Sequence, residues 1–114
     1  MSNQDLPHAI VDFLEEKKGE DILLLDLREV TDFCDYFVLC NGTSDRMLDA
    51  LADDLLRKIR QSHHKKGILE GRARDGWLLI DYGSVVVHLF SPDQRDYYAL
   101  EDLWQDGKAL IHIQ

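Results

Sequence analysis

The chain has 114 residues, which is enough for one folded domain and too few for two. Hydrophobic residues make up 45 % of it, so a core can form and general disorder is excluded. Thirteen Lys and Arg stand against 22 Asp and Glu, and the net charge of −9 argues against nucleic acid as the main partner. Charge complementarity favours a basic protein partner, although an acidic chain is equally typical of small soluble proteins that have none.

Neither a secretion signal nor a membrane segment is expected. The N-terminus lacks a basic region followed by an apolar run, and the apolar stretches are only a few residues long. Cys34 and Cys40 do not form a C-x-x-C pair, so a reduced, cytoplasmic setting is expected.

The first half of the chain predicts a helix, two apolar strands and a second helix. Apolar residues recur at helical spacing over Leu6–Lys18, and Pro7 suits the first turn. Asp21–Leu27 and Tyr36–Cys40 are strand-like runs rich in Leu, Val and Phe. A continuous apolar stripe then predicts a helix over Ser44–Ser62.

The second half predicts a hairpin-rich region. We expect a short strand at 68–70 and a polar turn at 71–76. Two strands at 77–81 and 85–90 follow, joined by a tight hairpin. A short helix is expected at 99–104 and a loose tail at 106–114. The order of elements predicts one α/β (α+β) domain over residues 1–114, with a mixed β-sheet flanked by helices and a core at about 5–105.

The two strands of the predicted hairpin leave one face of the sheet open. Side chains alternate between the two faces of a strand, so one face carries Trp77, Leu79, Asp81, Ser84, Val86, His88 and Phe90. A face that mixes aromatic, aliphatic and polar residues is typical of a protein interface. Two alternatives stay open on the residues alone: Trp77 as ordinary core, and His88 as a hydrogen-bonded structural histidine.

No catalytic residue, metal site or cofactor is predicted. The turn Asn41-Gly42-Thr43-Ser44 precedes a helix and loosely resembles the Gly-Ser turn of nucleotidyltransferases, but the Asp-x-Asp pair that would hold Mg²⁺ is absent. Adjacent His63 and His64 lack the spacing of metal ligands on a helix. A nucleotidyltransferase-like metal-dependent enzyme is one alternative function, and a homo-oligomeric scaffold that uses the open face is another.

Three blocks, taken together, resemble the ribosomal silencing factor family known as RsfS or Iojap. They are residues 35–46, residues 76–88 (Gly-Trp-Leu-Leu-Ile-Asp-Tyr-Gly-Ser-Val-Val-Val-His) and residues 95–104, and the resemblance covers about residues 5–105. It implies a fold similar to nucleotidyltransferases without the catalytic carboxylates. It implies no enzymatic activity.

The resemblance also implies a function and a site. Family members bind the large ribosomal subunit through the ribosomal protein uL-fourteen, block joining of the small subunit and repress translation when nutrients are scarce, and organelle relatives are linked to assembly of the large subunit. Homodimers are implied as well. By position, Trp77, Asp81, Tyr82 and His88 match the block that lies at the ribosomal contact. The family allows other apolar residues at Tyr82, and Ser84 stands where an acidic residue is more usual.

Overall fold

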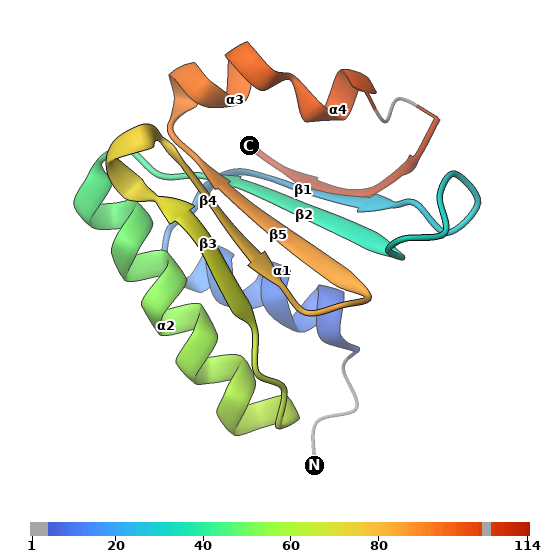
Figure 1. Cartoon of the computed structure of the whole chain (residues 1–114), viewed down its shortest axis with the longest axis horizontal. Coiled ribbons are helices and arrows are strands. Elements are labelled where there is room, and N and C mark those ends of the chain that lie inside the picture. Colours follow the sequence, from blue (N-terminus) through green and yellow to red (C-terminus); the bar gives the residue numbers. More distant parts are fainter. Residues whose placement is uncertain (1–4, 104–105) are drawn as a thin grey trace.

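A mixed, six-stranded β-sheet forms the centre of the molecule (Figure 1). The structure, a computed structural model, describes residues 5–103 and 106–114. The strands are β1 (Glu20–Asp26), β2 (Tyr36–Asn41), β3 (Ile68–Arg72), β4 (Trp77–Asp81), β5 (Val85–Phe90) and β6 (Lys108–Ile113). They lie in the order β3-β4-β5-β2-β1-β6, in which β2 and β5 are parallel and all other neighbours are antiparallel.

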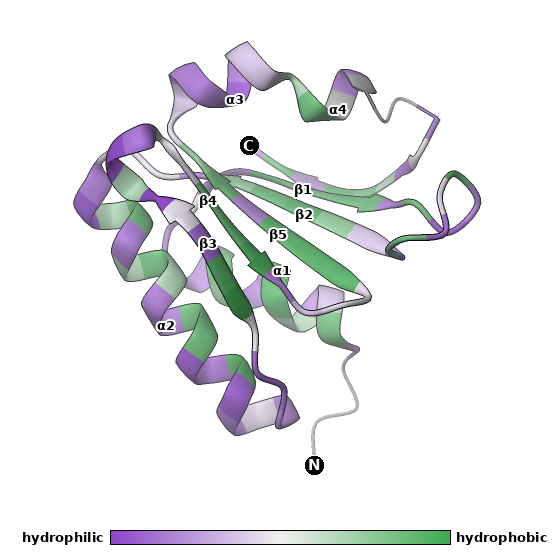
Figure 2. Cartoon of the chain, in the orientation of Figure 1, coloured by the Kyte–Doolittle hydropathy of each residue, from purple (hydrophilic) through white to green (hydrophobic). Residues whose placement is uncertain are grey.

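Two long helices cover one face of the sheet. They are α1 (Leu6–Glu16) and α2 (Asp45–His63), and α2 links β2 to the hairpin-rich half. Ser44 caps α2 by accepting a hydrogen bond from the backbone N–H of Met47, and His64 ends the helix in the left-handed conformation. Figure 2 shows the amphipathic character of α2, with apolar and polar residues alternating at helical spacing.

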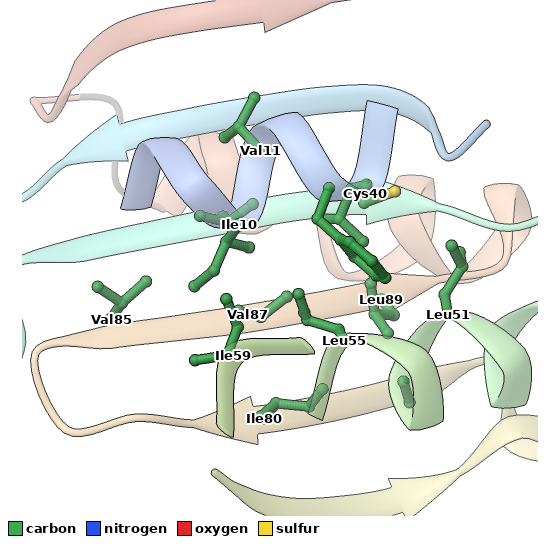
Figure 3. Packing of buried hydrophobic residues seen from close by; sticks show 14 of the residues in the cluster. Ile10, Val11, Cys40, Leu51, Leu55, Ile59, Ile80, Val85, Val87 and Leu89 are labelled. Carbon is green, nitrogen blue, oxygen red and sulfur yellow. The ribbon is translucent and has the colours of Figure 1, made fainter. Parts of the chain in front are cut away.

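The main core fills the space between these helices and the sheet. Figure 3 shows Leu51, Leu55 and Ile59 of α2 and Ile10 of α1 packing toward side chains of the strands. The strand residues on this face are almost completely buried: Leu78, Ile80, Val85, Val87 and Leu89. At about 25 cal/mol per Å² of apolar area, burial of this kind is the main force that stabilises the fold.

The opposite face of the sheet is only partly covered. A smaller buried cluster on this face is formed by Leu23, Leu25, Leu27, Cys34, Phe37, Leu39 and Phe90. Two short helices, α3 (Pro92–Tyr98) and α4 (Leu100–Leu103), lie on this side, and Leu100 packs against the cluster. The short helix η1 (Ala73–Asp75) connects β3 to β4.

Arg95 attaches α3 to the ends of β1 and β2. Its side chain is 4 % exposed, and Nη1 donates hydrogen bonds of 2.8 Å to the backbone oxygen of Asp21 and to Oδ1 of Asn41. A buried guanidinium needs such partners, because an unpaired buried charge is very costly.

The structure confirms a single α+β domain with a mixed sheet flanked by helices, and it places the five predicted strands and two long helices within about two residues of the expected bounds. The expectation of a loose tail at 106–114 was wrong, because Lys108–Ile113 forms β6 and pairs with β1. The expected short helix at 99–104 corresponds to α4 (Leu100–Leu103), and a further short helix, α3, precedes it from Pro92; Trp104 lies outside the described residues. Among the described helices, none combines the length and the apolar character that a membrane crossing needs.

Candidate functional site

The register of β3, β4 and β5 places nine side chains in three rows on the face that α1 and α2 do not cover. We call this surface the open face; its rows are Ile68–Asp81–Val86, Glu70–Leu79–His88 and Arg72–Trp77–Phe90. Paired residues on neighbouring antiparallel strands point to the same side of the sheet, so each row forms a continuous strip.

The open face presents a mixture of apolar and charged groups. Ile68 is 62 % exposed, and Trp77, Leu79, Asp81 and Val86 are half-buried. Glu70 and Arg72 are exposed on the edge strand, whereas His88 and Phe90 are buried. The predicted alternation is therefore correct for both strands of the hairpin.

Trp77 is held by an aromatic cluster. Its indole Nε1 donates a hydrogen bond of 3.2 Å to Nδ1 of His88. The indole stacks on Phe90 with ring centroids 5.1 Å apart. The ring of Tyr98, the last residue of α3, also contacts the indole, with ring centroids 4.4 Å apart. Trp77 is thus neither ordinary core nor a loose surface side chain: its orientation is fixed while part of the indole remains exposed.

His88 is more buried than the sequence suggested. We expected it on an open surface, but only 4 % of it is exposed, because the rings of Trp77 and Phe37 pack against it. Burial lowers the pKa of His88 to about 4, so the ring is neutral at pH 7. Since Nδ1 accepts the indole hydrogen bond, the ring proton must sit on Nε2, a buried atom that has no hydrogen-bond partner among the described residues.

Asp81 both lines the open face and closes the hairpin. Its Oδ1 accepts a hydrogen bond of 2.7 Å from the backbone N–H of Gly83. Gly83 has a φ of +85°, a conformation that glycine adopts easily, so the pair defines the turn between β4 and β5. Asp81 is half-buried, which leaves part of its carboxylate accessible.

Tyr82 does not join the other predicted site residues. It is 7 % exposed and belongs to the core beneath α1 and α2, because it continues the alternation of Leu78 and Ile80, whose side chains face the helices. Its ring lies against the loop that follows α2, where a Cβ added at Gly67 would come within 2.8 Å of it. Burial raises the pKa of Tyr82 to about 12. Ser84 is exposed at the turn, and its carbonyl accepts hydrogen bonds from the N–H groups of Asp35 and Tyr36.

Two further residues of the candidate site were missed. Ile68 lies on the open face because it pairs with Asp81 in the register between β3 and β4. The sequence of β3 alone does not specify this register. Tyr98, 41 % exposed, comes from α3 and extends the aromatic cluster around Trp77. Its place in the third family-like block was the available signal.

The structure offers no constellation for metal or nucleophile chemistry in the part of the chain that it describes. No group of three or more His, Cys, Asp or Glu that could hold a metal ion occurs there. Asp26 binds the guanidinium of Arg28, which lowers the pKa of that carboxyl to about 2. Both cysteines are buried free thiols, and burial raises their pKa. At the turn before α2, the side-chain oxygen of Asn41 already accepts a hydrogen bond from Arg95.

Comparison with known proteins gives a consistent result. A sequence model of the family described as "Ribosomal silencing factor during starvation" matches residues 1–114. The chain is 38 % identical over 110 residues to a ribosomal silencing factor RsfS of Halalkalibacterium halodurans, covering 96 % of this chain and 94 % of that protein. It is 42 % identical to the RsfS of Bacillus subtilis, covering 82 % and 79 %.

More distant relatives come from organelles, and solved structures share the fold. "Mitochondrial assembly of ribosomal large subunit protein 1" of Mus musculus is 36 % identical, and the match covers 83 % of this chain and 43 % of that protein. A crystal structure of a Chromobacterium violaceum protein superposes with a TM-score of 0.83 at 34 % identity, covering 92 % of this chain and 88 % of that one. A Bacillus halodurans crystal structure gives a TM-score of 0.75 at 38 % identity, covering 90 % and 95 %.

Proposed function

Because the chain belongs to the ribosomal silencing factor (RsfS) family, we propose that it binds the large ribosomal subunit, sterically blocks joining of the small subunit and so represses translation when nutrients are limiting. The protein contact is the ribosomal protein uL-fourteen, and the surface that makes it is the open face. No catalytic step is required, since an obstacle at the subunit interface acts by its bulk and its affinity.

The partly exposed, immobilised indole of Trp77 carries the assignment of the surface. Tryptophan is a frequent anchor of protein interfaces because it contributes a large contact area at a small loss of side-chain entropy. Here the hydrogen bond to His88 and the rings of Phe90 and Tyr98 fix the indole before any partner arrives. Such preorganisation lowers the entropic cost of binding.

His88 acts as a positioning residue in this proposal. A buried donor without a partner costs about 1–3 kcal/mol, and Nε2 of His88 is such a donor. That cost favours a role for the ring beyond stability, and its other nitrogen is the acceptor for the Trp77 indole.

The charges of the open face fit a basic protein partner. Asp81 lies between Ile68 and Val86 in one row, and Glu70 lies next to Leu79 in the next. With the net charge of −9, these carboxylates favour encounter with a basic ribosomal protein. A stable interface buries about 800 Å² on each partner, so we expect Tyr98 and other neighbouring side chains to take part in the contact beside the open face.

Sedimentation of separated ribosomal subunits tests the proposal. The subunits are recombined at a Mg²⁺ concentration that supports joining, with and without the protein, and resolved on a sucrose gradient. Free subunits should persist, and the protein should co-sediment with the large subunit alone. Full joining in the presence of a saturating amount of the protein would refute the steric block.

Two alternatives call for separate measurements. A nucleotide-using enzyme would be stabilised by its ligand through mass action, so a thermal-shift titration with nucleotides and Mg²⁺ should show no change under the silencing proposal. A homodimer built on the open face would appear in light scattering, and Trp77→Ala would then reduce its mass. An unchanged mass would exclude Trp77 from self-association.

A further inference from the structure

The positive charge of this acidic chain is concentrated at one place. Residues 55–69 contain five of the thirteen Lys and Arg and none of the 22 Asp and Glu. The five are Arg57, Lys58, Arg60, Lys65 and Lys66, and they occupy the last turns of α2 and the loop that leads into β3. All five are exposed. We call them the basic patch.

Three members of the basic patch line one depression. Arg57, Arg60 and Lys66 surround a shallow pocket of about 370 Å³, together with Leu56, Gly67 and the carboxylate of Asp53. Arg57 already pairs with Asp54 over 3.2 Å. Arg60 and Lys66, in contrast, make no ion pair within residues 5–103 and 106–114. Two cationic groups that form no ion pair among the described residues are therefore available to a ligand at this pocket, although Asp53 also lines it.

The helix dipole accounts for only part of this arrangement. The C-terminal end of a helix carries a partial negative charge that stabilises cations in its last turn, where Arg60 and His63 stand. Lys65 and Lys66 lie beyond the last turn, after the left-handed residue His64, and still continue the same run of positive charge.

The basic patch adjoins the open face. The loop that carries Lys65 and Lys66 runs directly into β3, whose first residue, Ile68, is the most exposed apolar side chain of the open face. Figure 1 shows the end of α2 and the start of β3 next to one another at one end of the sheet. A body that docks on the open face can therefore reach the basic patch at its rim.

We propose that the basic patch binds the phosphate backbone of RNA on the large ribosomal subunit, as a second contact beside the open face. A stripe of Lys and Arg along one part of a surface is the usual footprint of phosphate recognition, and a guanidinium matches the geometry of a phosphate group. The inference rests on the proposed function, which brings the protein to a particle rich in RNA. It also explains how an acidic protein can dock there: its remaining surface repels phosphate, so the patch restricts its orientation.

The test compares two double variants that remove the same charge. Arg60→Gln with Lys66→Gln removes the unpaired cations of the pocket. Lys18→Gln with Arg46→Gln is the control, because both residues are exposed and make no ion pair in the described chain. Affinity for purified large subunits is measured between 50 and 200 mM KCl. The slope of log affinity against log salt should become shallower by roughly two in the pocket variant and stay unchanged in the control.

A second measurement needs no ribosome. Amide chemical shifts of the ¹⁵N-labelled protein are followed on addition of a short RNA duplex, and separately of polyglutamate at the same charge concentration. RNA should shift residues 57–67 of the wild type and leave the pocket variant unchanged. Equal shifts with polyglutamate would point to an acidic protein instead and overturn the RNA assignment, as would equal salt slopes for the two double variants. RNA could shift the amide signals of the basic patch in a wild-type protein that does not bind large subunits. That result would refute the proposed function but would leave the RNA-binding assignment of the basic patch intact.

Discussion

The indole N–H of Trp77 donates its hydrogen bond to His88, its diagonal neighbour on the adjacent strand of the hairpin. A half-buried anchor on β4 is thereby fixed by a fully buried ring on β5. Through this bond a residue that is buried in the sheet orients a side chain of the open face.

Replacement of His88 by Phe should weaken binding to the large subunit without unfolding the protein. Phe fills a similar volume but cannot accept the indole hydrogen bond, so Trp77 loses a restraint worth about 0.5–1.5 kcal/mol, which is about two- to ten-fold in affinity. In a chain that also carries Trp104→Phe, the indole ¹⁵N–¹H signal of Trp77 should move upfield. His112→Phe on β6 is the control, and equal affinity of the two variants would exclude a positioning role for His88.

The same histidine predicts a pH dependence of stability. Its pKa is about 4 in the folded chain, below the ordinary value of 6.5, so the unfolded chain binds a proton over a range in which the folded chain does not. The stabilisation is therefore complete above pH 6.5 and is lost as the pH falls toward 4, by about 3 kcal/mol in total. Urea unfolding at several pH values should show this loss in the wild type and a smaller one in His88→Phe. If the unfolding free energies of the two proteins fell equally with pH, His88 would not be the cause of the pH dependence.

Truncation of Trp77 should have the largest effect on ribosome binding. Trp77→Ala removes the anchor and should weaken co-sedimentation with the large subunit by about ten-fold or more, equivalent to 1–2 kcal/mol. Far-ultraviolet circular dichroism should show a folded chain, because the larger core beneath α1 and α2 is untouched. If the folded variant sediments like the wild type, the open face is not the docking surface.

Ile68 and Leu110 offer a matched comparison of the two sheet edges. Both are exposed aliphatic residues, at 62 % and 44 %, but Ile68 lies on the open face at β3 and Leu110 lies on β6 at the other edge. Ile68→Ser should reduce affinity for the large subunit by roughly three-fold or more, since it removes apolar contact area. Leu110→Ser should leave the affinity unchanged. A larger loss of affinity in Leu110→Ser than in Ile68→Ser would instead place the interface at the β6 edge.

Arg95 should be important for the stability of the fold. Arg95→Met leaves the buried side chain of Asn41 without its donor and should lower the free energy of unfolding by about 3 kcal/mol. Arg74→Met, at an exposed position, should change it by less than about 0.5 kcal/mol. Urea denaturation of both variants measures the difference, and equal midpoints would mean that Arg95 does not hold α3 to the sheet.

The sequence predicted what depends on local periodicity. The alternation of Leu78 and Ile80 against Trp77 and Leu79 assigned the two faces of β4 correctly, and the apolar stripe of α2 located its buried side. The RsfS resemblance, carried by three blocks taken together, was confirmed by the family match over residues 1–114.

What the sequence missed depends on contacts between distant segments. The burial of His88 follows from Phe37, on a strand that the sequence does not show to be adjacent. Tyr82 lies in the core beside Ile80; the alternation of β4 indicated that side, whereas the family resemblance had grouped Tyr82 with residues of the opposite face. β6 is an exposed edge strand whose only strand partner among the described residues is β1, so its local pattern gave little signal.

The pairing of β1 with β6 has a consequence for synthesis of the chain. Asp21 in β1 and His112 in β6 share a hydrogen bond although 91 positions separate them. While a ribosome extends the nascent polypeptide, β1 emerges long before its outer neighbour, and one of its edges stays without backbone partners until residues 108–113 have left the exit tunnel. Closure of the sheet at this edge is therefore a late step of folding, and non-local pairing of this kind is slow. A factor proposed to act on the ribosome completes this edge of its own sheet only once β6 has left the exit tunnel of one.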